Sequence, residues 1–130
     1  MRRTAALGLT FLLATTACSG SSSSSTPASP HKPGADVAIP LLSFTPDTVS
    51  VKVGQTGTWT NGNDISHVRV EGTYQVDKGT GLRTSEKDDG SFSLKVNKKG
   101  DVVSHTYDKA GTFTYFCTIH KGMNGTVVVS

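Results

Sequence analysis

Three side chains near the C-terminus can bind a soft metal ion: Cys117, His120 and Met123. They follow a C-x-x-H-x-x-M spacing within residues 112–129, TFTYFCTIHKGMNGTVVV. A thiolate, an imidazole and a thioether suit copper better, as a set, than zinc, iron or magnesium. The flanking segments are apolar and β-prone, so we expect the three residues on a tight turn between two strands. The spacing therefore predicts a copper site.

Short segments of strand character, separated by turn residues, must position this turn. Val49, Val51 and Val53 alternate with polar residues, which is typical of a strand with one buried face. Further strands are expected at 37–45, 56–60, 67–71, 92–96, 102–107, 112–117 and 125–130. Residues 72–90 are polar and glycine-rich, and we expect a long surface connection there. The pattern predicts an all-β fold, an antiparallel two-sheet sandwich of about eight strands.

The first residues have the features of an export signal. Arg2 and Arg3 precede an apolar run of thirteen residues, Ala5 to Ala17. At about 1.5 Å per residue this run gives about 20 Å of helix, too short for a hydrocarbon core of about 30 Å. We therefore expect residues 1–17 to be a signal peptide and not a spanning helix.

The end of this signal, Thr15-Thr16-Ala17-Cys18, resembles a bacterial lipobox, although Leu is usual at the position of Thr15. The resemblance implies that Cys18 is acylated and anchors the exported protein to the outer face of the cytoplasmic membrane. The alternative is an ordinary signal peptidase site after Ala17, with Cys18 incidental. Residues 18–35 are rich in Ser and Pro and nearly free of apolar side chains, so we expect a flexible linker.

Cysteine usage supports a metal ligand at position 117. The sequence contains two cysteines. If Cys18 carries lipid, Cys117 has no disulfide partner in the mature chain. A lone thiol in an oxidising compartment is open to oxidation unless it is buried or bound to a metal.

The charge of the expected folded domain, residues 36–130, argues against a nucleic-acid partner. The sequence has 13 Lys and Arg, and removing Arg2, Arg3 and Lys32 leaves 10 basic residues against 10 Asp and Glu. A nucleic-acid-binding domain would keep a basic surplus on its folded part. We therefore expect no nucleic-acid partner.

The segments VSVKVGQTGTWTN, DISHV and GTFTYFCTIHKGMNGTVVV resemble the cupredoxins, small blue copper proteins that include plastocyanin, pseudoazurin and amicyanin. The resemblance covers residues 37–130, and the C-terminal spacing is similar to the short-loop version in amicyanin. It implies a Greek-key β-sandwich that binds one copper through His67, Cys117, His120 and axial Met123. A His₂Cys trigonal site with a weak axial Met is the arrangement of blue-copper electron-transfer sites.

Two histidines lie outside this ligand set. The family has no ligand at His105, which we interpret as a surface or edge-strand residue. His31 lies in the expected linker, where a single histidine is most simply solvated. These two residues are the candidates if a second metal bound.

Two positions depart from the family's pattern. Gly57 stands where an apolar β-branched residue is usual, so we expect local slack in a core strand. Val68 stands where the family often has Asn or Thr, whose polar side chain helps to tie the ligand loops together. We expect the site to be less rigid for that reason.

The resemblance implies one-electron transfer between Cu(II) and Cu(I). The exposed edge of His120 would be the electron port, with Ile119 and Met123 beside it, and a monomer would meet redox proteins through a small transient interface. An enzyme is not expected, because multicopper oxidases place His on both sides of the equivalent Cys, where this chain has Phe116 and Thr118. The alternative is a copper-binding lipoprotein for copper delivery or storage, which the same ligands would serve.

Overall fold

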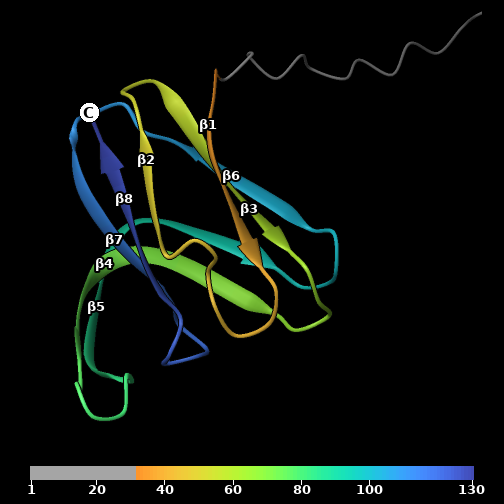
Figure 1. The fold of residues 1–130 in the computed structure, drawn as a ribbon, viewed down its shortest axis with the longest axis vertical. Coiled ribbons are helices and arrows are strands. Elements are labelled where there is room, and N and C mark those ends of the chain that lie inside the picture. The colour runs from red at the N-terminus through yellow and green to blue at the C-terminus, as the bar shows by residue number, and fades with distance from the viewer. Residues whose placement is uncertain (1–31) are drawn as a thin grey trace, which may run out of the picture.

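A computed structural model describes residues 32–130 as eight strands packed in two sheets (Figure 1). The strands are β1 (Lys32–Ile39), β2 (Thr48–Val51), β3 (Gln55–Asn61), β4 (His67–Val76), β5 (Arg83–Val96), β6 (Val102–Thr106), β7 (Gly111–Cys117) and β8 (Asn124–Val129). One sheet has the order β1-β3-β6 and the other β2-β8-β7-β4-β5. The predicted all-β sandwich is confirmed. Within the described range, no helix is long and apolar enough to cross a membrane.

Two strand pairs depart from the predicted antiparallel arrangement. β1 runs parallel to β3, and β2 runs parallel to β8. The strands β1, β2 and β3 follow one another in the chain, but β2 lies in the other sheet. The chain therefore crosses between the sheets at each step, and a crossing of this kind allows parallel pairing, whereas a tight hairpin allows only antiparallel pairing.

The segment 72–90 is a β-hairpin and not the surface connection that its composition predicted. β4 continues to Val76 and β5 begins at Arg83. Most side chains of this part of β5 are exposed on both faces, so the alternation expected of a half-buried strand is missing. At the tip, the Asp77 carboxylate accepts hydrogen bonds from the backbone N–H groups of Gly79 and Thr80. In Figure 1 this tip lies at the same end of the sandwich as the turn between β7 and β8.

The folded domain begins earlier than predicted. β1 starts at Lys32, so part of the expected linker pairs with β3: Lys32, Pro33 and Ala35 have partners, with a register shift between Pro33 and Ala35. Pro and Gly in this stretch gave it the composition of a linker, but parallel pairing with β3 holds the backbone. The expected signal peptide, the rest of the linker, Cys18 and His31 lie outside the described residues.

The core between the sheets contains a buried cation. Trp59 and Tyr115 are fully buried with ring centroids 5.5 Å apart, and the Arg69 guanidinium lies 3.8 Å from the Trp59 ring centroid. Arg69 donates a hydrogen bond of 2.7 Å to the Tyr107 hydroxyl, which in turn donates one of 2.9 Å to the Glu71 carboxylate. A buried charge is tolerated when it is paired and hydrogen-bonded in this way. The network lies directly beside the strand that ends at the predicted copper ligand.

The expected slack at Gly57 is not found. A Cβ atom at this position would lie 2.8 Å from the Trp59 ring, so the ring occupies the space that a side chain would need. The Trp59 ring therefore fills the space beside Gly57, and no gap remains in the packing there.

Candidate metal centre

His67 is the first residue of β4, and the loop before it sets its direction. The Asn61 side-chain amide donates to the Ile65 carbonyl oxygen at 3.0 Å, and the Ile65 N–H donates to the Asn63 side-chain oxygen at 2.7 Å. These bonds fix the turn that joins β3 to β4. His67 is 1% exposed, so the turn delivers a buried imidazole to one end of the sandwich.

The three C-terminal candidates lie on a closed turn between β7 and β8. The Cys117 N–H donates to the Met123 carbonyl at 3.0 Å, and the Met123 N–H donates to the His120 carbonyl at 3.1 Å. Cys117 and Met123 are fully buried, whereas His120 is half-buried. The tight turn predicted from the C-x-x-H-x-x-M spacing is therefore confirmed.

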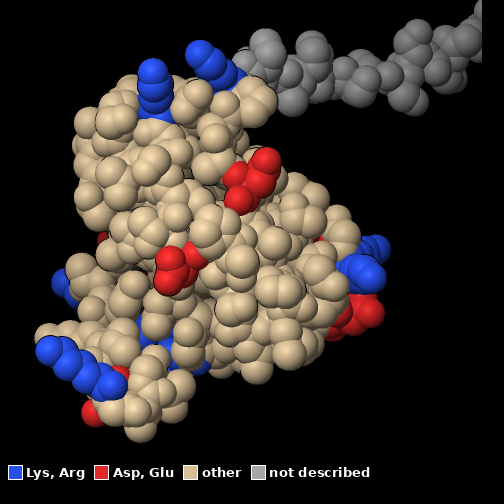
Figure 2. All heavy atoms as spheres, viewed as in Figure 1, with Lys and Arg blue, Asp and Glu red and all other residues tan. Residues whose placement is uncertain are grey.

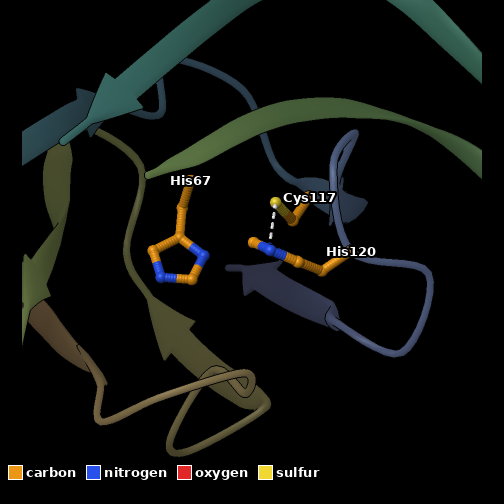
Figure 3. A group of neighbouring side chains, drawn as sticks. All are labelled: His67, Cys117 and His120. Carbon is orange, nitrogen blue, oxygen red and sulfur yellow. Dashed lines mark hydrogen bonds between the residues drawn. The ribbon is translucent and has the colours of Figure 1, made fainter. Parts of the chain in front are cut away.

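The side chains of His67, Cys117 and His120 converge at this end of the sandwich (Figure 3). One ligand atom from each lies within 4.8 Å of the other two. The Cys117 Sγ is 3.5 Å from the His120 Nδ1, and the two imidazole centroids are 5.0 Å apart. Across residues 32–130 this is the only cluster of three or more His, Cys, Asp or Glu ligand atoms this close together. One ion could contact all three.

The electrostatics of His67 also fit a metal. Both of its ring nitrogens are buried without a hydrogen-bond partner among the described residues. An unpaired buried polar group is costly, and metal ligation would satisfy one nitrogen. Burial, and to a lesser extent the charge of His120, lower the pKa of His67, so its imidazole stays neutral near pH 7. Neutral imidazole is the form that binds metal.

Copper agrees with this donor set. A thiol and two imidazoles lie close enough together to contact one ion, and Met123 is on the same turn, with its backbone bonded to Cys117 and His120. Soft sulfur with imidazole nitrogen favours copper among the common metals. The four residues predicted as ligands from the sequence are therefore chemically suited to copper.

The sequence interpretation missed Arg83. This residue is the first of β5, is 2% exposed, and donates hydrogen bonds to the carbonyl oxygens of Cys117 and Met123. A single arginine in a polar segment that was expected to be a surface connection gave no signal of this contact. The contact between Arg83 and the turn could have been predicted only if residues 72–90 had first been recognised as a β-hairpin.

His105 lies away from the centre. It is on β6, which is an edge strand of the β1-β3-β6 sheet, so its interpretation as an edge-strand residue is confirmed. Its ring stacks on Phe92 with centroids 4.0 Å apart and meets the edge of Tyr107 at 4.8 Å. His105 therefore has an aromatic packing role.

The chain is similar to known copper proteins in both sequence and fold. The family described as copper binding proteins, plastocyanin/azurin family, matches residues 33–130. Plastocyanin from Scenedesmus fuscus is 35% identical over 100 residues, which are 75% of this chain and 95% of that protein. Amicyanin from Paracoccus denitrificans is 34% identical over 95 residues, covering 72% of this chain and 63% of that protein. The solved structure of a purple cupredoxin from Nitrosopumilus maritimus has a TM-score of 0.58 at 26% identity, covering 74% of this chain and 99% of that one. With a match across the whole sandwich and a converging Cys and two His, this chain belongs to the plastocyanin/azurin family of copper-binding proteins, the cupredoxins.

Proposed function

We propose that this protein is a type 1 copper protein that carries single electrons between redox partners at the cell envelope. The observation that carries the proposal is the convergence of the Cys117 thiol with the His67 and His120 imidazoles within 4.8 Å, with Met123 on the same turn. The bound copper supplies the one-electron couple between Cu(II) and Cu(I). His67, Cys117, His120 and Met123 would hold it.

The protein's contribution is a fixed and largely dry set of ligands. His67, Cys117 and Met123 are each no more than 1% exposed, so water is kept from most of the site. Backbone hydrogen bonds close the turn that carries three of the ligands. A site held in this way changes little in shape when the charge on the metal changes, and that favours fast electron transfer.

His120 is the candidate port for the electron. It is the half-buried member of the set, and Ile119 next to it is 52% exposed. Leu82, 48% exposed at the tip of the β4–β5 hairpin, lies close to Gly122 on the same turn and adds to the apolar rim. Small apolar surfaces of this kind suit brief contacts with redox proteins.

The charged surface supports a protein partner in preference to nucleic acid. On the face shown in Figure 2, acidic and basic side chains are scattered over a mainly uncharged surface and form no basic stripe. This agrees with the balance of 10 basic and 10 acidic residues in residues 36–130. We propose that the protein acts as a monomer and has no enzymatic activity of its own.

The location at the cell envelope is proposed from the N-terminal sequence. Residues 1–17 have the pattern of a signal peptide, and Cys18 follows it at a site that resembles a lipobox. A lipid on Cys18 would hold the domain at the outer face of the cytoplasmic membrane through the Ser- and Pro-rich linker.

The visible spectrum of the domain loaded with Cu(II) tests the copper site. The wild type should show an intense thiolate-to-Cu(II) charge-transfer band and a blue or blue-green colour. Cys117→Ser should lose the band, whereas His105→Gln, outside the centre, should keep it. A colourless wild type that binds tetrahedral zinc in preference to copper would contradict the proposal.

A further inference from the structure

We propose that Arg83 is a positioning residue for the copper site and sets the geometry of the turn that carries Cys117, His120 and Met123. The inference rests on the copper site proposed above and gives a role to the β4–β5 hairpin. The Arg83 side chain forms its hydrogen bonds to Cys117 and Met123 with their main-chain oxygens. It acts on the main chain of the ligand residues, and its effect on the metal passes through them.

The Arg83 guanidinium bonds to both ends of the ligand turn. Its Nη2 donates to the Cys117 carbonyl oxygen at 2.6 Å, and its Nη1 donates to the Met123 carbonyl oxygen at 2.9 Å. Nη1 also donates to the Asn124 side-chain oxygen at 2.6 Å. Cys117 would supply a thiolate and Met123 a thioether to the metal, so one planar group fixes the separation of the two sulfur-bearing residues.

The hairpin backbone continues this contact. The Arg83 N–H donates to the carbonyl oxygen of Lys121, the residue after His120, at 3.1 Å. Arg83 is thereby hydrogen-bonded to the main chain at the start of the turn (Cys117), in its middle (Lys121) and at its end (Met123). Figure 1 shows the hairpin and the turn at the same end of the sandwich.

The guanidinium is buried and held in one orientation. The Arg83 side chain is 0% exposed, and its carbon Cζ lies 4.7 Å from the centroid of the Phe116 ring. Its Nε donates to the Glu86 carboxylate at 2.7 Å, which offsets the buried charge. Because the fork of an arginine is planar and rigid, these bonds together leave the side chain little freedom to move.

Arg83 also adds side-chain hydrogen bonds to the ligand turn, which residue 68 does not supply. Val68, next to His67, has no polar side chain with which to tie the ligand loops. Arg83 reaches the turn from a different hairpin and supplies charge-assisted hydrogen bonds. Partners that orient metal ligands typically change metal affinity or activity by about 10- to 100-fold when they are removed.

Two substitutions of Arg83 test the role of its hydrogen bonds separately from its charge and its packing. Arg83→Lys keeps the positive charge, but a single ammonium cannot reproduce the fork that joins the two carbonyls. Arg83→Met keeps much of the apolar stem and removes every hydrogen bond. Lys87→Met is the matched control, because it removes a positive charge from an exposed position of the same hairpin and leaves Arg83 and its partners in place.

The experiment compares the four proteins after loading with Cu(II), by visible and paramagnetic resonance spectra, and then measures loss of Cu(I) to a chelator. We expect both Arg83 variants to change the intensity ratio of the thiolate-to-Cu(II) bands and to lose Cu(I) at least about 10-fold faster than wild type. Lys87→Met should keep the wild-type spectrum. Unfolding of the copper-free proteins shows which variants fold, and if Arg83→Met does not, Arg83→Lys decides the result.

The outcomes separate this inference from the proposed function. A wild type with no charge-transfer band would contradict the copper site itself. A blue wild type together with an Arg83→Lys variant of unchanged spectrum and Cu(I) loss would overturn only the positioning role. A loss of copper-free stability with an unchanged spectrum would likewise show that Arg83 supports the fold and does not position the ligands.

Discussion

The backbone N–H of Thr118 donates a hydrogen bond of 2.9 Å to the carbonyl oxygen of Val68. Each of these residues directly follows a proposed copper ligand, Cys117 and His67 respectively. The bond therefore joins the two ligand segments through main-chain atoms. This main-chain tie does not depend on the side chain at position 68, so the two segments stay connected with valine there.

Replacing the proposed ligand Met123 should raise the reduction potential. Met123 is fully buried, and leucine has a similar volume, so Met123→Leu should fold. Loss of the soft axial donor destabilises Cu(II) relative to Cu(I), and for one electron a rise of about 60 mV corresponds to about 1.4 kcal/mol. Voltammetry of both proteins measures the shift. An unchanged potential would mean that Met123 is not a ligand.

An electron carrier and a copper donor should differ in how fast they lose metal. The turn carrying Cys117, His120 and Met123 is closed by hydrogen bonds, and His67 comes from a separate strand, so release requires several ligands to let go. We expect the reduced, copper-loaded protein to reduce a small oxidised redox protein faster than it loses Cu(I) to a competing chelator. Rapid metal loss with slow electron exchange would favour delivery or storage.

An alanine at position 125 should destabilise the sandwich. A Cβ atom on Gly125 would overlap the ring of Tyr115, the residue opposite it on β7. Forcing a methyl group into a packed core typically costs about 1 to 3 kcal/mol. Denaturant unfolding of the copper-free protein measures the loss. Gly122→Ala is the control, since its Cβ would lie at an ordinary 3.6 Å from Leu82, and equal stabilities of the two variants would contradict the packing argument.

His105 should make the copper-free domain less stable in mild acid. Burial, and then the positive charge of Arg69, lower the pKa of His105 from its ordinary 6.5, while Asp108 acts in the opposite direction. The unfolded chain therefore binds the proton first, so stability falls as the pH drops below about 6.5 and through the folded-state value. His105→Gln should show a smaller loss of melting temperature between about pH 7 and 5 than wild type. An equal or steeper loss would rule out this contribution.

Acylation of Cys18 predicts that the protein is retained by membranes. Each buried CH₂ contributes about 0.8 kcal/mol, and two or more chains hold a protein firmly where one binds marginally. Cys18→Ser should release the protein into the soluble fraction or leave it unprocessed. Fractionation of cells that express each form measures the difference. Unchanged retention of the variant would point to an ordinary cleavage site after Ala17.

The parts of the site that are local in sequence could be predicted, and those made by distant segments could not. The C-x-x-H-x-x-M spacing indicated a turn because Cys117, His120 and Met123 are close in the chain. His67 could be assigned only through the family resemblance, since a single histidine opening a strand carries no metal signal. The Arg83 contacts depend on a partner more than thirty positions away, and no pattern in a polar segment reveals such a pair.

The fold shows the same division. Alternating valines indicated a strand with one buried face, and Val49 and Val51 are buried on β2, whereas Val53 lies beyond its end and is exposed. The β4–β5 hairpin was missed because strands exposed on both faces have no apolar alternation. The buried pair of Arg69 and Glu71 was missed as well, because charged residues at alternate positions look like the solvent-facing side of a strand.

The parallel pairing of β1 with β3 places the start of β1 at the end of the domain that is far from the proposed copper site. Lys32 at the start of β1 pairs with Gln55, whereas β3 ends at Asn61, beside the loop that leads to His67. At about 3.3 Å per residue, the length of β1 separates its first residue from the copper end by about 25 Å. A domain fixed to an electrode through a group on its N-terminal segment would thus turn His120 toward the solution. Attachment through a residue on the β4–β5 hairpin would turn His120 toward the electrode. The attachment point alone should therefore decide whether the copper exchanges electrons with the electrode or with a redox protein in solution.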